Sequence, residues 1–230
     1  MAPRTPAAAH LTKSKPEILR SAQDDKASAS ERTLMEAIHQ RYGALITYVC
    51  RKSSIPEAFI AALIANESGR WAADGNPTPA RFEKHVLRKL REVRDGMRKD
   101  YAGLTLADLK DASEEILRAD ASSWGLTQIM GYHVIKNGFP PFKLNDPEVN
   151  LTKAIALLRD FAGHFQLDVT REFEEMFRCW NSGAPYDDPK TPRIEGKTHD
   201  PKYVEKGLAR MGIYEELGSG SQDLGETGVA

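Results

Sequence analysis

Glu67 is an acidic residue on the apolar side of a predicted helix. It follows Ile60, Leu63 and Ile64 by seven, four and three residues, spacings that share one helical face. Burial there disfavours the carboxylate, and the negative end of the helix dipole adds to this effect, so we expect a raised pKa. A carboxyl group that stays protonated near neutral pH can protonate a leaving oxygen, as glycosidic bond cleavage requires. The alternative is a glutamate at a frayed helix end that points into solvent.

Three further motifs follow Glu67 in order along the chain. The first segment is ALIANES, and the later ones are SSWGLTQIM, FRCWNSG and YVEKGL. Together they resemble soluble lytic transglycosylases and their goose-type lysozyme relatives, whose pattern is E-S, G-L-x-Q-I/L-M, A-Y-N-x-G and a late Tyr-Val. The matching residues are Glu67, Ser68, Gly125, Leu126, Gln128, Ile129, Met130, Trp180, Asn181, Gly183, Tyr203 and Val204, with Trp180 where tyrosine is usual.

This resemblance implies a lysozyme-like fold and an enzyme that cleaves the β-1,4 bond between N-acetylmuramic acid and N-acetylglucosamine in peptidoglycan. It implies that Glu67 is the acid and base of a lytic transglycosylase, which forms 1,6-anhydro ends. The substrate-binding residues that it implies are Ser68, Gln128, Met130, Trp180, Asn181 and Tyr203. Such an enzyme would act on the cell wall, in the periplasm or outside the cell.

A second resemblance leaves the reaction open. The segment Phe82-Glu83-x-His85 is similar to the F-E-R-H motif of phage-type N-acetylmuramidases, which are hydrolases. A hydrolase needs a second group that holds water or attacks the sugar, and Glu83 and Asp74 are the candidates. Asp74 is also a typical turn residue in ADGNP, and Glu83 is also a typical solvated or helix-capping residue.

Other residues carry weaker signals. Trp71, Trp124 and Trp180 are either stacking platforms for sugar rings or core residues. The basic stretch from Arg81 to Lys99 either meets an anionic wall or lipid or forms a solvated helix face. Two rival functions are therefore a catalytically silent wall-binding module and a nucleic-acid-binding protein, although the net charge of −1 disfavours the second.

The elements that position these residues are predicted to be helices. We expect an all-α domain at 30–216 with at most one small hairpin, a disordered or weakly helical tail at 1–29 and a flexible C-terminal tail at 217–230. Capping boxes are predicted at Ser28 with Glu31 and at Ser54 with Glu57. Residues 73–83 are predicted to form a hairpin or loop, and Ser122 or Ser123 is predicted to begin a short helix.

Composition narrows the class of protein. The chain has 230 residues, enough for one domain with a core, and no apolar run of about 18 residues that would predict membrane insertion. Cys50 and Cys179 are expected to be buried thiols, and no histidine shows metal-ligand spacing with them, so we expect no metal or cofactor. A monomer is the default expectation. The N-terminus lacks the apolar core of a secretory signal, which leaves phage-type release, effector injection or a misassigned start as routes to the wall.

Overall fold

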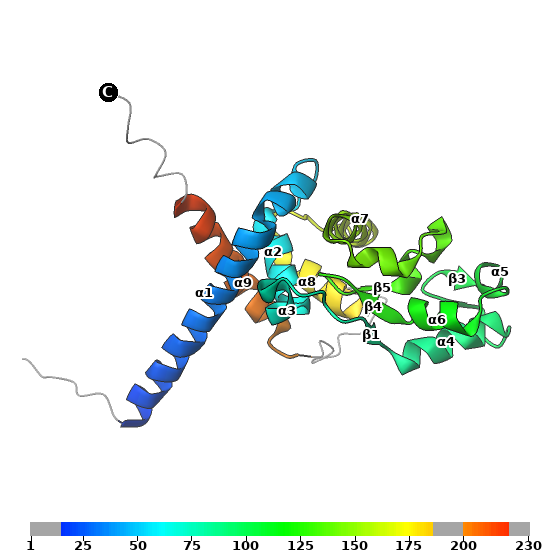
Figure 1. Ribbon diagram of the computed structural model, residues 1–230, viewed down its shortest axis with the longest axis horizontal. Coiled ribbons are helices and arrows are strands. Elements are labelled where there is room, and N and C mark those ends of the chain that lie inside the picture. The colour runs from blue at the N-terminus through cyan, green and yellow to red at the C-terminus, as the bar shows by residue number, and fades with distance from the viewer. Residues whose placement is uncertain (1–14, 186–199, 221–230) are drawn as a thin grey trace, which may run out of the picture.

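The structure is a computed structural model that describes residues 15–185 and 200–220 (Figure 1). It is mostly helical, which confirms the predicted class at this level, but its two small antiparallel sheets exceed the single hairpin that was predicted. The helices are α1 (Lys15–Cys50), α2 (Glu57–Glu67), α3 (Gly69–Asp74), α4 (Lys84–Arg94), α5 (Leu106–Leu109), α6 (Glu114–Asp120), α7 (Pro147–Phe165), α8 (Phe173–Ser182) and α9 (Tyr203–Gly220). Three short 3-10 helices are η1 (Gly131–His133), η2 (Ile135–Asn137) and η3 (Pro141–Asn145).

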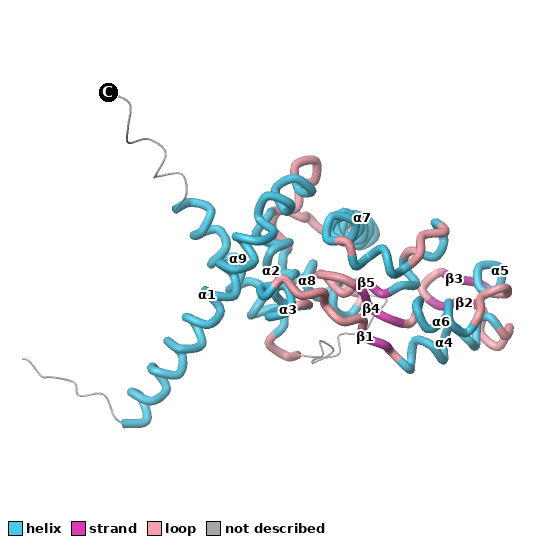
Figure 2. The backbone as a smooth tube through the Cα atoms, in the orientation of Figure 1, coloured by secondary structure: helices cyan, strands magenta, loops and turns pink. Residues whose placement is uncertain are grey.

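The strands are short and form two sheets (Figure 2). The first sheet contains β1 (Arg81–Phe82), β4 (Ser122–Trp124) and β5 (Ile129–Met130), in the order β1-β4-β5 with antiparallel pairing. The second pairs β2 (Asp100–Tyr101) with β3 (Leu104–Thr105). In Figure 1 the first sheet lies between a larger lobe around α1, α2 and α9 and a smaller lobe with α4, α5 and α6.

Helix α2 is the centre of the larger lobe. Its residues from Ala58 to Ala65 are all buried, because α1, α7, α8 and α9 contribute side chains to the core around it. The sequence EAFIAALIANE is apolar on nearly every face, as a fully enclosed helix requires. Phe59 stacks on Phe177 of α8 with ring centroids 4.3 Å apart. The C-terminal end of α2, which carries Glu67, is therefore held by a rigid core.

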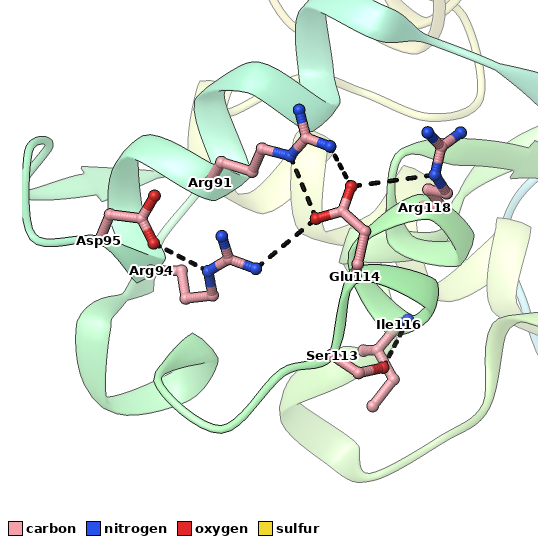
Figure 3. Close-up of polar contacts among 7 residues, drawn as sticks. All are labelled: Arg91, Arg94, Asp95, Ser113, Glu114, Ile116 and Arg118. Carbon is pink, nitrogen blue, oxygen red and sulfur yellow. Dashed lines mark hydrogen bonds and ion pairs between the residues drawn. The ribbon is translucent and has the colours of Figure 1, made fainter.

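The smaller lobe has its own core of aliphatic side chains. Val86, Leu90, Leu109 and Leu117 come together from α4, α5 and α6. Thr105 forms a capping box with Asp108 at the start of α5. At the start of α6, Ser113 accepts a hydrogen bond from the Ile116 amide (Figure 3). These caps satisfy amides that the first helical turn leaves unpaired.

The N-terminal helix differs from its prediction. Residues 15–29 belong to α1 and not to a separate disordered or weakly helical tail, so Ser28 and Glu31 lie inside the helix and form no capping box. The second predicted box is also wrong, since Pro56 is the N-cap of α2 and Glu57 accepts a hydrogen bond from Thr47. At the other end of the chain α9 continues to Gly220, past the predicted boundary at 216, and residues 221–230 lie outside the described residues, as do 1–14.

The segment after Ser122 forms a hairpin and not the predicted helix. Strands β4 and β5 pair, and the chain reverses between them because Gly125 has φ +71° and Gln128 has φ +52°. A side chain at Gly125 would also collide with the Leu144 carbonyl oxygen, 2.0 Å from an ideal Cβ. Glycine is therefore required at this turn.

Candidate active site

A cleft of about 840 Å³ runs along the first sheet, between the two lobes. Glu67 and Asn181 line it from the larger lobe, Gln128 and Met130 line it from the sheet, and Tyr101 lines it from the smaller lobe. Its volume is in the range of ligand-binding clefts. The structure thus brings the motif at the end of α2, the hairpin and the motif on α8 to one concave site.

Glu67 has the electrostatics of a proton donor. Burial raises the pKa of its carboxyl group to about 7, while the Tyr203 hydrogen bond and the Arg81 charge oppose that rise. Desolvation dominates because a carboxylate loses more hydration than these two partners replace. At neutral pH both protonation states are therefore populated, which suits a group that must give and then take a proton.

Tyr203 lies behind Glu67 and holds its carboxyl group. The Tyr203 hydroxyl donates a hydrogen bond to Glu67 Oε1, and the tyrosine side chain is only 6% exposed. Burial and the neighbouring carboxylate raise the Tyr203 pKa well above its usual range, so the hydroxyl stays protonated. The resemblance implied that Tyr203 binds substrate, but its geometry is that of a buried partner of the acid.

Ser68 is also placed away from the cleft. It is 4% exposed, and its hydroxyl donates to the Leu126 carbonyl oxygen at 2.5 Å while accepting from the Thr78 hydroxyl at 2.8 Å. These bonds join the end of α2 to the hairpin turn. Ser68 therefore fixes the two halves of the site to each other and does not present a group to substrate.

Gln128 lines the cleft from a backbone conformation that few residues adopt. Its side-chain amide donates to the Gly125 carbonyl oxygen at 3.0 Å, and its Oε1 accepts from the Ser123 hydroxyl at 2.7 Å. Asn150 of α7 supports the same turn, because its Oδ1 accepts from both the amide and the hydroxyl of Thr127 at 2.9 and 2.7 Å. The turn is thus rigid before any ligand binds.

Helix α8 forms one wall of the cleft with Trp180 and Asn181. The Trp180 indole N–H donates to the Thr127 carbonyl oxygen at 3.2 Å, which fixes the ring beside the hairpin. Asn181 Oδ1 is buried and has no hydrogen-bond partner among the described residues. A buried acceptor of this kind is costly unless a ligand supplies a donor.

The candidate second carboxylates lie in different environments. Glu83 lines the cleft, and its side chain accepts from Arg81 Nε at 2.7 Å and lies 3.5 Å from His85 Nδ1. It also begins α4 as the N-cap residue, although no side-chain capping bond forms. Asp74 is exposed at the end of α3 and is not among the residues that line the cleft.

The three tryptophans separate into two groups. Trp71 is 51% exposed and lines the cleft, and Trp180 lines it too while packing partly against the core. Trp124 packs in the small core cluster next to the sheet, and its indole N–H donates to the Ala119 carbonyl oxygen at 2.9 Å. The geometry of Trp71 and Trp180 is compatible with stacking on sugar rings, whereas Trp124 is a core residue.

Sequence reasoning missed several residues of the cleft. Arg81 was considered only as part of a basic stretch, but it lines the cleft and its charge acts on Glu67. Tyr101 and His133 also line the cleft. Outside the cleft lining, Asp120 is a second buried carboxyl group with one oxygen unpartnered among the described residues, and burial raises its pKa to about 7.

Other classes of site have no support within the described residues. No group of three or more His, Cys, Asp or Glu side chains there is arranged to hold a metal ion. None of the helices in these ranges is long and apolar enough to cross a bilayer. Cys50 and Cys179 are both buried and no disulfide joins them, as predicted. Comparisons of the sequence with models of known protein families and with curated proteins found no match.

Proposed function

We propose that this protein has a lysozyme-like fold and cleaves the β-1,4 glycosidic bond between N-acetylmuramic acid and N-acetylglucosamine in peptidoglycan. One observation carries the proposal: Glu67 is partly buried, desolvation raises the pKa of its carboxyl group to about 7, and it lines the cleft. A glycosidic oxygen is a poor leaving group, so its departure needs a proton from such an acid.

The walls of the cleft fit an N-acetylated glycan. Asn181 Oδ1 is a buried acceptor that an acetamido N–H or a sugar hydroxyl can satisfy. Trp71 and Trp180 provide indole faces on which the C–H faces of sugar rings can pack.

The reaction that we favour is that of a lytic transglycosylase. Protonated Glu67 donates its proton to the glycosidic oxygen as the bond between that oxygen and C1 of the muramic acid breaks. The resulting carboxylate then removes the proton from the C6 hydroxyl of the same sugar, whose oxygen bonds to C1 and forms a 1,6-anhydro end. The Tyr203 hydroxyl stabilises the carboxylate between these two steps.

Hydrolysis by an N-acetylmuramidase is the second candidate, because Glu83 lines the same cleft as Glu67. In that reaction Glu83 would hold water or attack the sugar. Its Oε1 accepts from Arg81, and His85 lies beside Oε2, so Glu83 would have to exchange one of these contacts for water or substrate. That requirement is why we rank hydrolysis second.

The basic stretch gives little support to a nucleic-acid-binding function. Arg88 lies 3.7 Å from Glu92, Arg94 lies 2.9 Å from Asp95, and Arg91 pairs with Glu114 (Figure 3). Acidic neighbours on the same surface thus offset these charges. A nucleic-acid interface needs an excess of positive charge to displace counterions from phosphates.

The test is a digest of purified peptidoglycan in which soluble products are weighed by mass spectrometry. Wild type is compared with Glu67→Gln, Glu83→Gln and, as a control of an exposed carboxylate outside the cleft, Asp74→Asn. We expect products one water lighter than hydrolysed fragments, a loss of about 10²- to 10⁴-fold in rate for Glu67→Gln, and full activity for Asp74→Asn.

Other outcomes separate the alternatives. Products with reducing ends, lost in Glu83→Gln, would replace transglycosylation by hydrolysis. A Glu67→Gln variant with wild-type activity would refute the proposed catalytic acid. Binding of wild-type protein to wall sacculi without any product would instead identify a silent wall-binding module.

A further inference from the structure

A chain of polar side chains runs from the surface of α1 to the carboxyl group of Glu67. Glu31 accepts two hydrogen bonds from Arg210, from Nε at 2.6 Å and from Nη2 at 3.1 Å. Arg210 Nη1 donates to Asn66 Oδ1 at 2.7 Å, and Asn66 Nδ2 donates to the Tyr203 carbonyl oxygen at 3.0 Å. The hydroxyl of the same tyrosine donates to Glu67.

Arg210 is the centre of this chain because it uses its guanidinium group in two directions. It is 8% exposed, and a buried arginine is tolerated when its charge and its N–H groups are matched. Glu31 supplies the opposite charge on α1, and Asn66 supplies a neutral acceptor on α2. The planar fork of arginine suits this arrangement, since its N–H groups point at fixed angles to both partners.

The hydrogen-bonded series links α2 and α9 close to Glu67. Asn66 directly precedes Glu67 on α2, and Arg210 follows Tyr203 by seven residues, two helical turns along the same face of α9. Helices α2 and α9 contact each other and both contribute apolar side chains to the main core, and such packing is not directional. Directional bonds are needed to set where the Tyr203 hydroxyl lies relative to Glu67.

We propose that Arg210 is a positioning residue of the active site, which fixes Asn66 against the main chain of Tyr203 and so aims the Tyr203 hydroxyl at Glu67. This inference rests on the proposed function for its effect on rate. Its effect on the geometry of Glu67 does not depend on which substrate the protein cleaves.

The effect of a misplaced Tyr203 on the Glu67 pKa depends on the other groups that act on this carboxyl group. Tyr203 approaches the carboxyl group from α9, and the charge of Arg81 acts on it from β1. The tyrosine hydroxyl stabilises the carboxylate, so its loss raises the Glu67 pKa further. The side chain of Arg81 is 68% exposed, and its interaction with Glu67 is weakened by solvent, so Arg81 does not replace the hydrogen bond.

The experiment compares Arg210→Lys with Arg32→Lys. Lysine keeps the charge of Arg210 but cannot reach Glu31 and Asn66 together in the arginine geometry. Arg32 provides the matched control, because it also joins α1 to α9, through a 2.8 Å ion pair with Glu216, but it has no bond to Asn66 or Tyr203. Tyr203→Phe is the reference for complete loss of the hydroxyl.

Two quantities are measured on each full-length variant. The first is the titration of the Glu67 carboxyl group by ¹³C NMR, assigned by its absence in Glu67→Gln. The second is kcat/KM on purified peptidoglycan across pH. We expect Arg210→Lys to raise the Glu67 pKa toward the Tyr203→Phe value and to lower kcat/KM by about 10- to 100-fold, while Arg32→Lys matches wild type in both.

The outcomes separate this inference from the proposed function. A Glu67 titration in Arg210→Lys that matches wild type would overturn the inference whether or not the protein cleaves peptidoglycan. A shifted titration without any cleavage by wild type would support the positioning role and refute the proposed substrate. If circular dichroism shows that Arg210→Lys is unfolded, Asn66→Ala takes its place with the same expected and contrary results, because it breaks the same link.

Discussion

Two arginine–glutamate clusters with similar chemistry lie in different environments of this protein. In the larger lobe the Arg210 side chain is 10% exposed and that of its partner Glu31 is 37% exposed. In the smaller lobe Glu114 lies among Arg91, Arg94 and Arg118 on the surface (Figure 3), with Arg91 and Glu114 each 43% exposed. The first cluster leads to the candidate catalytic acid, and the second joins α4 to α6.

The difference between the clusters is one of solvent screening. Water and salt weaken the attraction between exposed charges, so the surface cluster contributes little to the free energy of folding. A buried guanidinium group has lost its hydration, so removal of either side of its network leaves a partner unsatisfied. We therefore expect function to depend on the Arg210 cluster and not on the Glu114 cluster.

The largest loss of stability is expected at Arg210, when Arg210 and Arg91 are each replaced by methionine. Arg210→Met leaves Glu31 and Asn66 without their donor, and we expect the free energy of unfolding to fall by about 2–3 kcal/mol. Arg91→Met removes an exposed partner of Glu114, while Arg94 and Arg118 remain nearby, so its urea midpoint should stay close to that of wild type. Equal shifts of the two urea midpoints would contradict the comparison.

The next effect concerns the cost of burying Glu67. Its pKa rises from an ordinary value of 4.5 to about 7 on folding, so the folded state binds the proton more tightly than the unfolded state. Between these values the Glu67 contribution to stability falls as pH rises, because the folded protein must ionise a buried group. Glutamine avoids this cost. We expect Glu67→Gln to gain about 2–3 kcal/mol over wild type between pH 5 and pH 8.

Urea unfolding at the two pH values measures this difference. The control is Glu114→Gln, whose carboxylate has a lowered pKa because Arg91 binds it, so any pH effect has the opposite sign. A Glu67→Gln variant whose stability relative to wild type is the same at pH 5 and pH 8 would show that Glu67 is solvated in the folded protein.

The local sequence pattern was enough to predict that Glu67 lies on the apolar face of a helix, but not to predict the residues that contact it. The placement of Glu67 among Ile60, Leu63 and Ile64 is a property of one helix, and that helix is present at the predicted place. Arg210 and Asn66 are 144 residues apart, and Glu31 and Arg210 are 179 residues apart, so no spacing rule connects them. Asn66 belongs to the ANES segment, but no feature of the local sequence indicated its role.

Two errors in the predicted elements have identifiable causes. The apolar residues of WGLTQIM favoured a helix in the sequence. The positive φ angles of Gly125 and Gln128 instead reverse the chain, and Asn150 of α7 holds that turn by a hydrogen bond. The start of α1 was missed because residues 15–29 contain few large apolar side chains. Their alanine, lysine, arginine and glutamine residues favour a helix without forming an apolar face.

Trp71 tests whether exposure alone makes a side chain dispensable. It is half exposed, like the surface cluster, but it lines the cleft. If it stacks on a sugar ring, Trp71→Ala should raise KM for soluble glycan fragments by about three- to tenfold with little change in kcat. Tyr48→Ala, which removes an exposed aromatic residue of α1 outside the cleft lining, is the control. An unchanged KM in Trp71→Ala would place the glycan away from this side chain.

The smallest effect is expected at Glu114. Glu114→Gln removes the carboxylate that Arg91, Arg94 and Arg118 surround, but Arg91 and Arg118 are exposed to water and Arg94 keeps its ion pair with Asp95. The core of Val86, Leu90 and Leu117 holds α4 against α6 without this charge. We therefore expect peptidoglycan digestion within about twofold of wild type, at both low and high salt. A loss as large as that of Arg210→Lys would mean that the smaller lobe, through this surface cluster, sets the shape of the cleft.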